Sequence, residues 1–416
     1  MGGLKKRRVV VTGIGVVAPN GFSITKFWSS LLKGESAVNV IQAFDLRELQ
    51  EVNLAAEVLS FNPADFIPRN LVRKLDRFAQ FGVAASRIAL DDAGLDLASN
   101  DNKQIGVSIG SGLGGILFHE EQIERLINGD PDKVSAASVP RISPNSVSSY
   151  VAIVFGLRGT NLAISTACSS GANAIGVARD LIRYGKLEIV IAGGVEAPIS
   201  KTTFSAYAAL RVLAKRTQNP QKACRPFDKT RDGFVLGEGG GIVILESLEH
   251  ATQRGEKIYA EVAGFSSSCG AYHMVTPDPS GADAASAMIA ALEDAELSSS
   301  SIGYINAHGT GTIANDLAET KAVKMVFGSY AKRIPISSTK AVTGHLIGAA
   351  GAVECIVSIL ALRHQIIPPT ANYEHIDAEC DLDYVPSARS AKLHAAMSNS
   401  FGFGSNNAVL VLTQVN

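Results

Sequence analysis

The sequence is poor in aromatic and charged residues. Among its 416 residues only 6% are aromatic and 19% are charged, and Trp28 is the one tryptophan. The 38 Lys and Arg residues are balanced by 39 Asp and Glu residues, so the chain lacks the positive surplus with which nucleic-acid binders meet phosphates. Because 46% of the residues are hydrophobic, disorder is also excluded and a large buried core is expected.

Cysteine is scarce as well, and no Cys-x-x-Cys pair occurs. The five cysteines are odd in number and widely spaced, which excludes a disulfide framework and a zinc ribbon. We therefore expect a reducing compartment and predict a cytoplasmic protein. Four of the cysteines are interpreted as inert small hydrophobic residues: Cys224, Cys269, Cys355 and Cys380.

Long apolar runs are missing too, since none approaches 18 uninterrupted residues, and no transmembrane helix is expected. The first apolar run, Val9–Val17, follows a basic cluster as in a signal peptide, but glycines interrupt it and many of its residues are β-branched. We interpret it as a buried strand. A membrane is therefore not among the expected partners.

Short apolar runs alternate with alanine-rich helical patterns, and no run of Pro, Gly or Ser marks a linker. This alternation predicts an α/β architecture with helices covering mixed sheets. The predicted strands are Arg8–Thr12, Ile105–Ile109, Leu187–Ala192, Gly241–Glu246, Ala260–Phe265, Ile302–Asn306, Ile334–Ser337 and Asn407–Leu412. The predicted helices are Lys74–Asp92, Ala172–Tyr184, Ala282–Ala295, Leu317–Phe327 and His345–Leu362.

A faint internal repeat links residues 164–176 with residues 336–352. Each segment has an apolar strand end, a Ser/Thr turn and a helix with Gly and Ala on its packing face. One explanation is that α/β proteins often repeat strand–turn–helix units. The other is a duplicated fold whose halves place equivalent helix starts at one shared centre.

Cys168 is expected in a turn between a strand and a helix start. A thiol there would meet free backbone N–H groups and the positive end of a helix dipole, and both stabilise a thiolate. The geometry would resemble a nucleophile elbow, which exposes its side chain on a sharp turn. The pattern predicts a reactive thiol, with an inert buried cysteine as the alternative.

Two histidines lie in glycine-containing loops at strand-to-helix connections. His308 follows a predicted strand, and His345 opens a predicted apolar helix. A helix N-terminus biases a histidine towards its neutral form, and a neutral imidazole can stabilise a developing negative oxygen. A satisfied core or surface histidine is the alternative for each. Metal binding is disfavoured because no HxxxH or HxxE–H pairing accompanies them.

Several charged residues are expected to support these loops or to bind a partner. Lys340 and Glu354 could form a buried ion pair that orients the helix of His345. Asp316 and Glu319 have capping-box spacing and are interpreted first as helix caps. A basic group at four-residue spacing would form one helix face, either solvated or facing an acidic partner. This group consists of Arg69, Arg73 and Arg77, with Lys74 beside them.

The order Cys168, His308, Lys340, His345, followed by the Asn-Ser-Phe-Gly-Phe-Gly loop at 399–404, resembles the elongating β-ketoacyl-acyl-carrier-protein synthases of type II fatty acid synthesis. The resemblance covers essentially the whole chain. It is carried by four motifs: Thr-Ala-Cys-Ser-Ser, Ala-His-Gly-Thr-Gly-Thr, Thr-Lys-x-x-x-Gly-His and Gly-Ala-Ala-Gly-Ala-Val-Glu. It implies the thiolase fold, with two similar α/β halves in a five-layered αβαβα arrangement, and a homodimer. We place the half with the nucleophilic cysteine at residues 1–256 and the half with both histidines at residues 257–416.

The resemblance also implies roles for individual residues. Cys168 would be the acyl-accepting nucleophile, and His308 and His345 would promote decarboxylation of a malonyl thioester and stabilise the enolate. Phe403, between two glycines, would be a gate, and its N–H and that of Cys168 would form the oxyanion hole. Lys340, paired with Glu354, would organise the site electrostatically.

Further positions carry over from the same resemblance. The substrate-binding residues would be Leu113, Thr310, Thr312 and Phe401, with Leu113 in the deeper acyl pocket. The supporting residues would be Glu354, Asp316 and Glu319, and the carrier-docking residues Arg69, Arg73 and Lys74. A structural monovalent cation would be held by Asn306, Glu354, Ser398 and Asn399.

The implied reaction is a decarboxylative Claisen condensation of an acyl thioester with malonyl-acyl-carrier protein, without a cofactor. A degradative thiolase would need a second cysteine in the loop 402–407, which has none. A chain-length partner subunit would lack Cys168, and a cysteine hydrolase would hydrolyse its acyl-enzyme. Gly311 and Ser405 depart from the housekeeping pattern, so a discrete ketosynthase of a polyketide or polyene pathway is the alternative function.

Overall fold

The computed structural model describes residues 6–44, 52–98, 100–129, 131–215 and 218–415. Ten strands form two matching halves that join where β1 pairs with β9. The first half has the order β5 (Asn161–Ile164), β4 (Ile105–Gly110), β6 (Ile189–Glu196), β8 (Gly239–Ser247) and β1 (Val9–Val17). The second has the order β11 (Ile336–Ser337), β10 (Tyr304–Asn306), β14 (Ala395–Gly402), β15 (Asn406–Thr413) and β9 (Ala260–Cys269).

The pairing directions show that the fold is duplicated. In each half the first three strands in this order pair in parallel, and the remaining two pairings are antiparallel. The strands also follow one another along the chain in the same sequence in both halves. The faint repeat in the sequence is therefore the trace of two equivalent halves.

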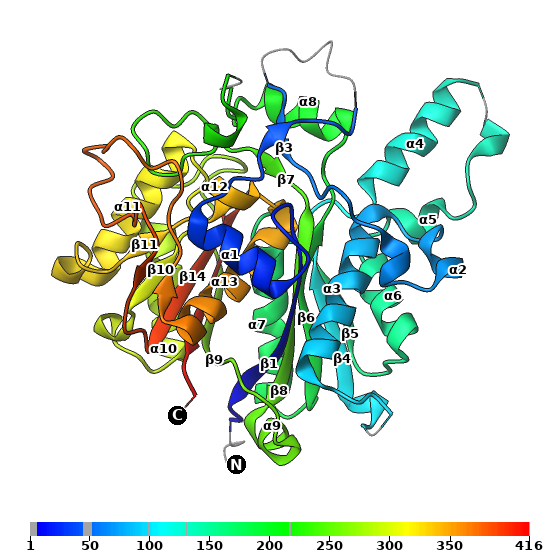
Figure 1. Ribbon diagram of the computed structural model, residues 1–416, viewed down its shortest axis with the longest axis horizontal. Coiled ribbons are helices and arrows are strands. Elements are labelled where there is room, and N and C mark those ends of the chain that lie inside the picture. The colour runs from blue at the N-terminus through cyan, green and yellow to red at the C-terminus, as the bar shows by residue number, and fades with distance from the viewer. Residues whose placement is uncertain (1–5, 45–51, 99, 130, 216–217, 416) are drawn as a thin grey trace.

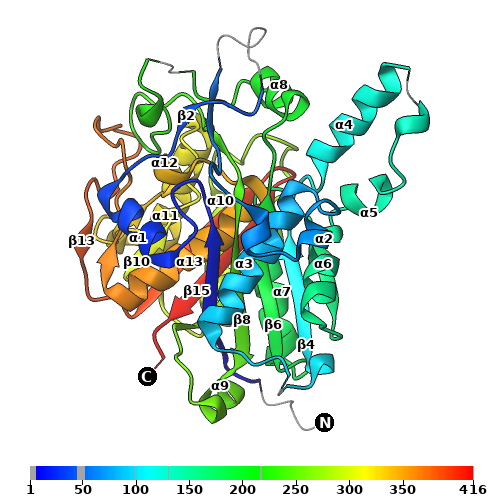
Figure 2. The same cartoon turned by 45° about the vertical axis from the view of Figure 1, so that its right-hand side comes forward.

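Helices complete a five-layered arrangement (Figures 1 and 2). The central layer contains α7 (Ser170–Arg183) and α13 (Ala350–His364), which pack against each other and contact strands of both halves. One outer layer contains α3 (Arg77–Ala93) and α6 (Ser146–Phe155), and the other contains α10 (Ala282–Asp294) and α11 (Ile313–Phe327). This is the αβαβα arrangement that the resemblance implied.

The remaining elements lie at the ends of these layers. The helices are α1 (Ile24–Lys33), α2 (Arg69–Val72), α4 (Ile116–Ile127), α5 (Ser138–Ile142), α8 (Lys201–Ala209), α9 (Leu248–Arg254) and α12 (Lys340–Thr343). The short strands are β2 (Asn39–Val40), β3 (Leu54–Ala56), β7 (Leu236–Gly237), β12 (Ile366–Ile367) and β13 (Arg389–Ser390).

The helical stretch Ile347–His364 is long and apolar enough, by length and composition, to cross a membrane. However, 89% of it is buried inside the protein, because α13 is the central helix between the two halves. Small residues make this position possible. An added Cβ at Gly171 of α7 would lie 3.0 Å from the Ala352 Cβ of α13, so the two helices approach closely there.

All eight predicted strands and five predicted helices exist, with shifted ends. The predicted helix Lys74–Asp92 begins instead at Arg77, because Asp76 caps its N-terminus by accepting from the Phe78 N–H. The predicted helix His345–Leu362 begins as α13 only at Ala350. The first difference separates Arg77 from Arg69 and Arg73, and the second places His345 before α13 rather than at its start.

Candidate active site

Cys168 lies in a tight turn between β5 and α7. The preceding residue, Ala167, has a left-handed φ of 52°, which is uncommon for a residue with a Cβ. The hydroxyls of Ser169 and Ser170 donate to the backbone oxygens of Thr166 and Ala167 and close the turn. The elbow-like turn is therefore present, although the Cys168 side chain is not exposed, since the residue is only 6% accessible.

His345 faces this thiol from the second half of the chain. Its Nε2 atom lies 3.1 Å from the Cys168 Sγ atom. His345 does not open α13, as the sequence suggested, but lies between α12 and a short 3-10 turn at Ile347–Ala349. Its own N–H donates to the backbone oxygen of Val235 at 2.7 Å, so a β-type contact fixes it rather than a helix start.

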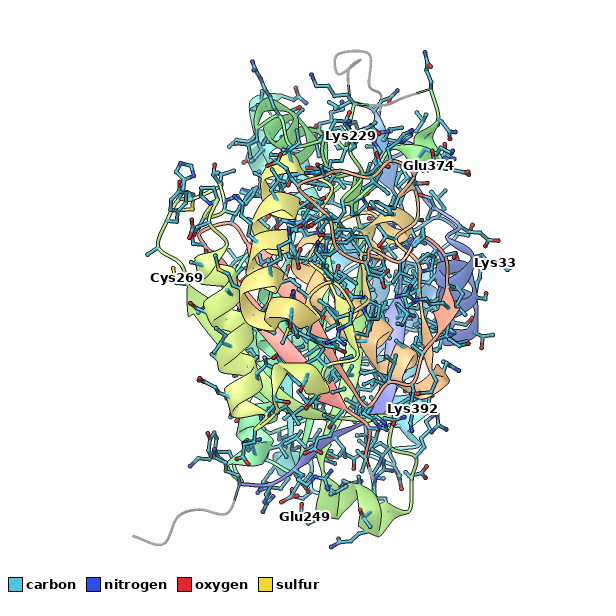
Figure 3. All side chains as sticks on the ribbon, turned by 90° about the vertical axis from the view of Figure 1, so that its left-hand side faces the viewer. Lys33, Lys229, Glu249, Cys269, Glu374 and Lys392 are labelled. Carbon is cyan, nitrogen blue, oxygen red and sulfur yellow. The ribbon has the colours of Figure 1, made fainter. Side chains whose placement is uncertain are left out.

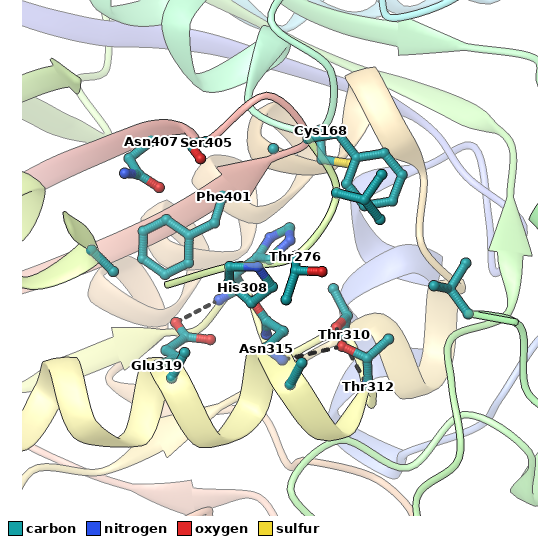
Figure 4. Close-up of a pocket in the computed structure, with 18 of the residues that line it drawn as sticks. Cys168, Thr276, His308, Thr310, Thr312, Asn315, Glu319, Phe401, Ser405 and Asn407 are labelled. Atoms are coloured by element: carbon teal, nitrogen blue, oxygen red, sulfur yellow. Dashed lines mark hydrogen bonds between the residues drawn. The ribbon is translucent and has the colours of Figure 1, made fainter. Parts of the chain in front are cut away.

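His308 follows β10, and Glu319 of α11 holds its loop. The Glu319 carboxylate accepts from the backbone N–H of His308 at 2.9 Å and from that of Gly309 at 2.8 Å (Figure 4). Asn399 donates to the same carboxylate at 3.1 Å. The ring centroid of His308 lies 5.5 Å from that of His345, so the two imidazoles share one site.

The helix-cap interpretation of Asp316 and Glu319 is wrong. Thr312 caps α11, and its side chain accepts from the N–H of Asn315. Asp316 instead accepts from the backbone N–H of Gly311 at 3.2 Å. The three-residue spacing of Asp316 and Glu319 therefore places both carboxylates on one face of α11. From there they accept hydrogen bonds from the backbone of the His308 loop.

Lys340 and Glu354 form the expected buried ion pair, and both residues are almost inaccessible. The Lys340 Nζ atom also donates to the backbone oxygen of His308 and lies 3.5 Å from the Nδ1 atom of the same residue. Lys340 begins α12 and Glu354 lies in α13, so the pair links two helices to the His308 loop.

Burial and Lys340 set the protonation of the site. Burial lowers the pKa of His308 and of His345 well below 6.5, and the positive charge of Lys340 lowers both further. Both imidazoles are therefore neutral at neutral pH, as expected, but not because of a helix dipole. Burial also raises the pKa of Cys168 to about 12, against the opposing effect of Lys340, so its resting form is a thiol.

Phe403 lies in the tight turn between β14 and β15, where Gly404 has a φ of 79°. The backbone N–H of Phe403 donates to the Cys168 thiol and lowers its pKa, which opposes part of the effect of burial. The Phe403 ring is half-buried, with its centroid 6.4 Å from that of Tyr207 on α8. The turn thus places one N–H donor and one aromatic ring beside the sulfur.

A cavity of about 160 Å³ lies next to Cys168, the two histidines and Phe403. Its lining includes the predicted Thr310, Thr312 and Phe401 (Figure 4). Leu113 is not part of this lining; it is half-buried in the loop after β4, where its N–H donates to Glu196 at 3.1 Å. Its role in an acyl pocket therefore stays a prediction.

Several lining residues had not been assigned from the sequence. The aromatic Tyr207 and Phe234 come from segments without a recognisable motif, and only the fold brings them here. Asn315, Ser405 and Asn407 lie next to the motifs already noted, so their position beside a motif could have identified them from the sequence. The missed residues include Tyr207, Phe234, His273, Thr276, Asn315, Ser405 and Asn407.

Four positions expected around a cation carry buried oxygen atoms without a hydrogen-bond partner. They are Asn306 Oδ1, Glu354 Oε2, Ser398 Oγ and Asn399 Oδ1. Asn306 and Ser398 are paired in register on β10 and β14, which brings these two residues close together. In the part of the chain that the structure describes, no group of three or more His, Cys, Asp and Glu residues could hold a metal ion. Oxygen donors of this kind suit a hard cation.

The predicted arginine face is wrong in one respect. Arg69 lies in α2, Arg73 follows it, and Arg77 begins the separate helix α3. Arg77 turns inward and pairs with Glu238 at 2.6 Å. Arg69, Arg73 and Lys74 are exposed, and the ion pairs found among the described residues do not include them.

The other cysteines only partly match the expectation of inert apolar residues. Cys224, Cys355 and Cys380 are buried, as expected. Cys269 is exposed at the end of β9 (Figure 3), with its Sγ atom 3.6 Å from the backbone oxygen of Gly404. All five are free thiols.

Comparison with known families decides the assignment. Residues 6–251 match the family model of the β-ketoacyl synthase N-terminal domain, and residues 259–374 match that of the C-terminal domain. The chain belongs to the β-ketoacyl synthase family. Two curated relatives of this synthase, both named 3-oxoacyl-[acyl-carrier-protein] synthase 2, come from Coxiella burnetii and Vibrio harveyi. Each is 44% identical, and the alignments cover 99% of this chain and 100% of each relative.

Solved structures agree with the fold of the synthase. A β-ketoacyl synthase from Burkholderia phymatum superposes with a TM-score of 0.91 at 36% identity, over 99% of this chain and 100% of that one. A type II polyketide ketosynthase, solved with its acyl-carrier protein and bound to the hexaketide, superposes with a TM-score of 0.92 at 37% identity over the same shares. Both neighbours confirm the fold that the resemblance implied.

Proposed function

We propose that the protein elongates acyl chains by condensing an acyl thioester with malonyl-acyl-carrier protein. The observation that carries this proposal is the convergence of the Cys168 thiol and two neutral histidines at one cavity, with the Lys340–Glu354 pair bound to the His308 loop. The curated relatives, named 3-oxoacyl-[acyl-carrier-protein] synthase 2, support the fatty-acid version of this reaction.

In the first step the acyl group moves from its carrier thioester to Cys168. The Cys168 sulfur bonds to the acyl carbon, the carrier sulfur leaves, and the thiol proton passes to the departing carrier thiolate. His345 Nε2 lies 3.1 Å from this sulfur, within hydrogen-bond distance of it. The N–H of Phe403, directed at this sulfur, would bind the oxyanion together with the N–H of Cys168.

In the second step a malonyl thioester loses carbon dioxide. The electron pair of the broken C–C bond becomes an enolate, whose oxygen His308 and His345 stabilise by donating hydrogen bonds. Neutral imidazoles suit this role, and the low pKa values of both histidines keep them neutral. Lys340 holds the loop through the backbone oxygen of His308.

In the third step the enolate carbon attacks the acyl carbon on Cys168. The new C–C bond gives a β-ketoacyl carrier thioester, and the Cys168 thiolate leaves and takes up a proton. The reaction consumes one proton and releases one carbon dioxide for each two-carbon extension. Every step is performed by side chains and backbone donors of this chain.

A monovalent cation would fit the buried oxygens of Asn306, Glu354, Ser398 and Asn399, which lack other partners. We propose that these residues hold it as a structural ion. A bound cation would supply positive charge opposite the second oxygen of Glu354, whose first oxygen binds Lys340. It would thereby stabilise the β10–β14 pairing behind His308.

We propose that the substrate carrier is an acidic acyl carrier protein and that it docks on the exposed Arg69, Arg73 and Lys74. The polyketide ketosynthase neighbour was solved together with its acyl-carrier protein. Complementary charge would speed the encounter, and added salt would weaken it. The five free thiols support our placement of this activity in the cytoplasm.

We also propose a homodimer formed through β5. This strand is an edge of the sheet, and its residues alternate between exposed and half-buried, whereas every residue of β4 and β6 is buried. Ile153 of the adjacent α6 is 68% exposed. An unpaired edge next to an exposed apolar residue suits pairing with a second copy. We keep the boundary between the two halves at residues 256 and 257.

A polyketide or polyene ketosynthase is the second candidate function. Gly311 and Ser405 depart from the housekeeping pattern, and the polyketide ketosynthase is 37% identical. The chemistry of one condensation is the same, so only the products distinguish the two candidates. A polyketide enzyme would extend an unreduced β-keto chain repeatedly.

The deciding experiment supplies the purified protein with malonyl carrier and a ladder of acyl primers, followed by mass spectrometry of the carrier products. We expect β-ketoacyl carrier species two carbons longer than each accepted primer. Poly-β-keto products would select the second candidate. Release of free acid without chain extension would refute both.

A further inference from the structure

Glu196 ends β6 as a fully buried carboxylate that has no part in the steps above. Four donors from two other segments surround it. They are the Ser111 hydroxyl at 2.9 Å and the backbone N–H groups of Gly112 at 2.6 Å, Leu113 at 3.1 Å and Gly348 at 3.1 Å. Among the described residues, no lysine, arginine or histidine forms an ion pair with it.

Glycines make this approach possible. A Cβ at residue 112 would lie 2.9 Å from the Glu196 Oε2 atom, and one at residue 348 would lie 2.5 Å from it. Gly112 belongs to the loop after β4, and Gly348 to the 3-10 turn that follows His345. The carboxylate therefore joins two segments that are far apart in the sequence.

The residue before Gly348 is strained. Ile347 has a φ of 46°, a left-handed conformation that β-branched residues avoid and adopt only where the surroundings hold them. The hydrogen bond from the Gly348 N–H to Glu196 is such a restraint. In this conformation the Ile347 side chain belongs to the same apolar cluster as Cys168.

The two segments held by Glu196 meet beside the nucleophile's turn. A Cβ at Gly112 would lie 3.4 Å from Ile347 Cγ2 and 3.9 Å from the Cα of Ala167. The loop that carries Leu113 and the side chain of Ile347 thus adjoin the residue that precedes Cys168. Burial raises the pKa of Glu196 to about 7, and the four donors oppose that rise by favouring the carboxylate.

We propose that Glu196 is a positioning residue for the acyl group on Cys168. By holding the Leu113 loop and the strained Ile347 together, it shapes the apolar space next to the thiol and so determines which acyl chains Cys168 accepts. The proposal rests on the proposed function, because it presupposes an acyl group on this sulfur. A long chain, which touches more of the surrounding wall than a short one, depends most on this restraint.

The test is the rate of Cys168 acylation by a ladder of carrier-bound saturated acyl primers, followed by intact-protein mass spectrometry. In Glu196→Gln an amide NH₂ group replaces one carboxylate oxygen and cannot accept hydrogen bonds from the surrounding N–H groups. The remaining amide oxygen is an uncharged and therefore weaker acceptor. We expect the ratio of the long-chain rate to the short-chain rate to fall about tenfold. Ser111→Ala removes one donor only and should lower the ratio about threefold.

Glu246→Gln is the matched control. Glu246 is also a fully buried carboxylate of the first half, but it is bound by Arg254 at 2.8 Å and is paired with Ile189 at the opposite end of β6. The Glu246→Gln variant should leave the ratio of long-chain to short-chain acylation rates unchanged. A folded Glu196→Gln with an unchanged ratio overturns the proposal, even if all its rates fall together. If this variant does not fold, an unchanged ratio in Ser111→Ala overturns it. A wild-type protein that accepts no primer at all refutes the proposed function instead.

Discussion

The Nε2 atom of His345 lies 3.1 Å from the Sγ atom of Cys168, although the two residues are 177 positions apart in the sequence. Cys168 belongs to the first half of the duplicated fold and His345 to the second. The contact exists because the small-residue faces of α7 and α13 pack against each other in the central layer. The duplication therefore assembles the site.

Replacing Cys168 with alanine should abolish both acyl labelling and condensation. The Cys168 thiol contacts His345, whose ring lies next to that of His308, and this thiol is needed for the covalent intermediate. Mass mapping of protein treated with an acyl-carrier thioester should locate the label at Cys168. The exposed Cys269 provides the control, because Cys269→Ala should keep labelling and turnover. A label found mainly at Cys224 or Cys355 would show that the assignment is wrong.

His308→Ala and His345→Ala should each lose malonyl decarboxylation while Cys168 can still be acylated. Each substitution removes a donor to the developing enolate oxygen, and the loss of one such donor typically costs on the order of 10²–10³ in rate. Carbon dioxide release and acyl labelling are measured separately for each variant. Normal carbon dioxide release from both would exclude the two histidines from this role.

The rate of decarboxylation should stay constant as the pH falls from about 8 to about 6. A histidine with an ordinary pKa of 6.5 would take up a proton in this interval and lose the neutral form. In this site burial and Lys340 lower the pKa of both histidines, so protonation is displaced to more acidic solution. Carbon dioxide release at a series of pH values, with malonyl carrier saturating, measures this directly. A midpoint near 6.5 would contradict the neutral, buried state.

Local sequence patterns predicted which residues form the site. The contacts that these residues make depend on segments far away in the sequence, and these contacts were not predicted. An apolar run located the strand before His308, because buried strands follow from hydrophobicity along a few residues. The start of α13 was misplaced because the apolar pattern continues through the 3-10 turn, where Ile347 adopts a positive φ that periodicity does not reveal. Glu319 binds the loop of His308 instead of capping α11.

Non-local partners account for the remaining differences. Arg77 fits the four-residue spacing of an exposed basic face, but Glu238, 161 residues away along the chain, draws it into an ion pair. The thiol of Cys168 has the local setting of a stabilised thiolate, yet burial by distant segments raises its pKa to about 12. In both cases burial or charge from another part of the chain outweighs the local pattern.

Charge reversal of Arg69 and Arg73 together should raise the Michaelis constant for carrier-bound substrates and weaken its dependence on salt. The two side chains are exposed and supply positive charge for an acidic carrier. Substrates on a short pantetheine analogue should be almost unaffected. The exposed Lys26 and Lys392 lie in other parts of the fold, and their joint reversal to glutamate is the matched control. Equal losses with both kinds of substrate would mean that the reversal damages the fold.

Phe403→Ala should uncouple the two half-reactions. The ring lies in the β14–β15 turn beside Cys168 and Tyr207, where Gly404 with its φ of 79° allows the backbone to rotate. In the resting protein the ring should restrict access of malonyl groups to the cavity, and acylation of Cys168 should displace the turn. Without the ring, malonyl groups would enter before Cys168 is acylated and lose carbon dioxide unproductively.

The measurement is the ratio of carbon dioxide released to β-ketoacyl product formed, together with separately timed acylation and condensation. In the wild type the ratio should be close to one, because each condensation releases one carbon dioxide. In Phe403→Ala it should rise, since decarboxylation no longer waits for the acyl group. Phe66→Ala, a half-buried phenylalanine packed on Phe61 in the first half, should leave the ratio unchanged. An unchanged ratio and unchanged half-reaction rates in Phe403→Ala would exclude the gate while leaving Cys168 and the two histidines in their roles, because the gate depends only on the ring of Phe403.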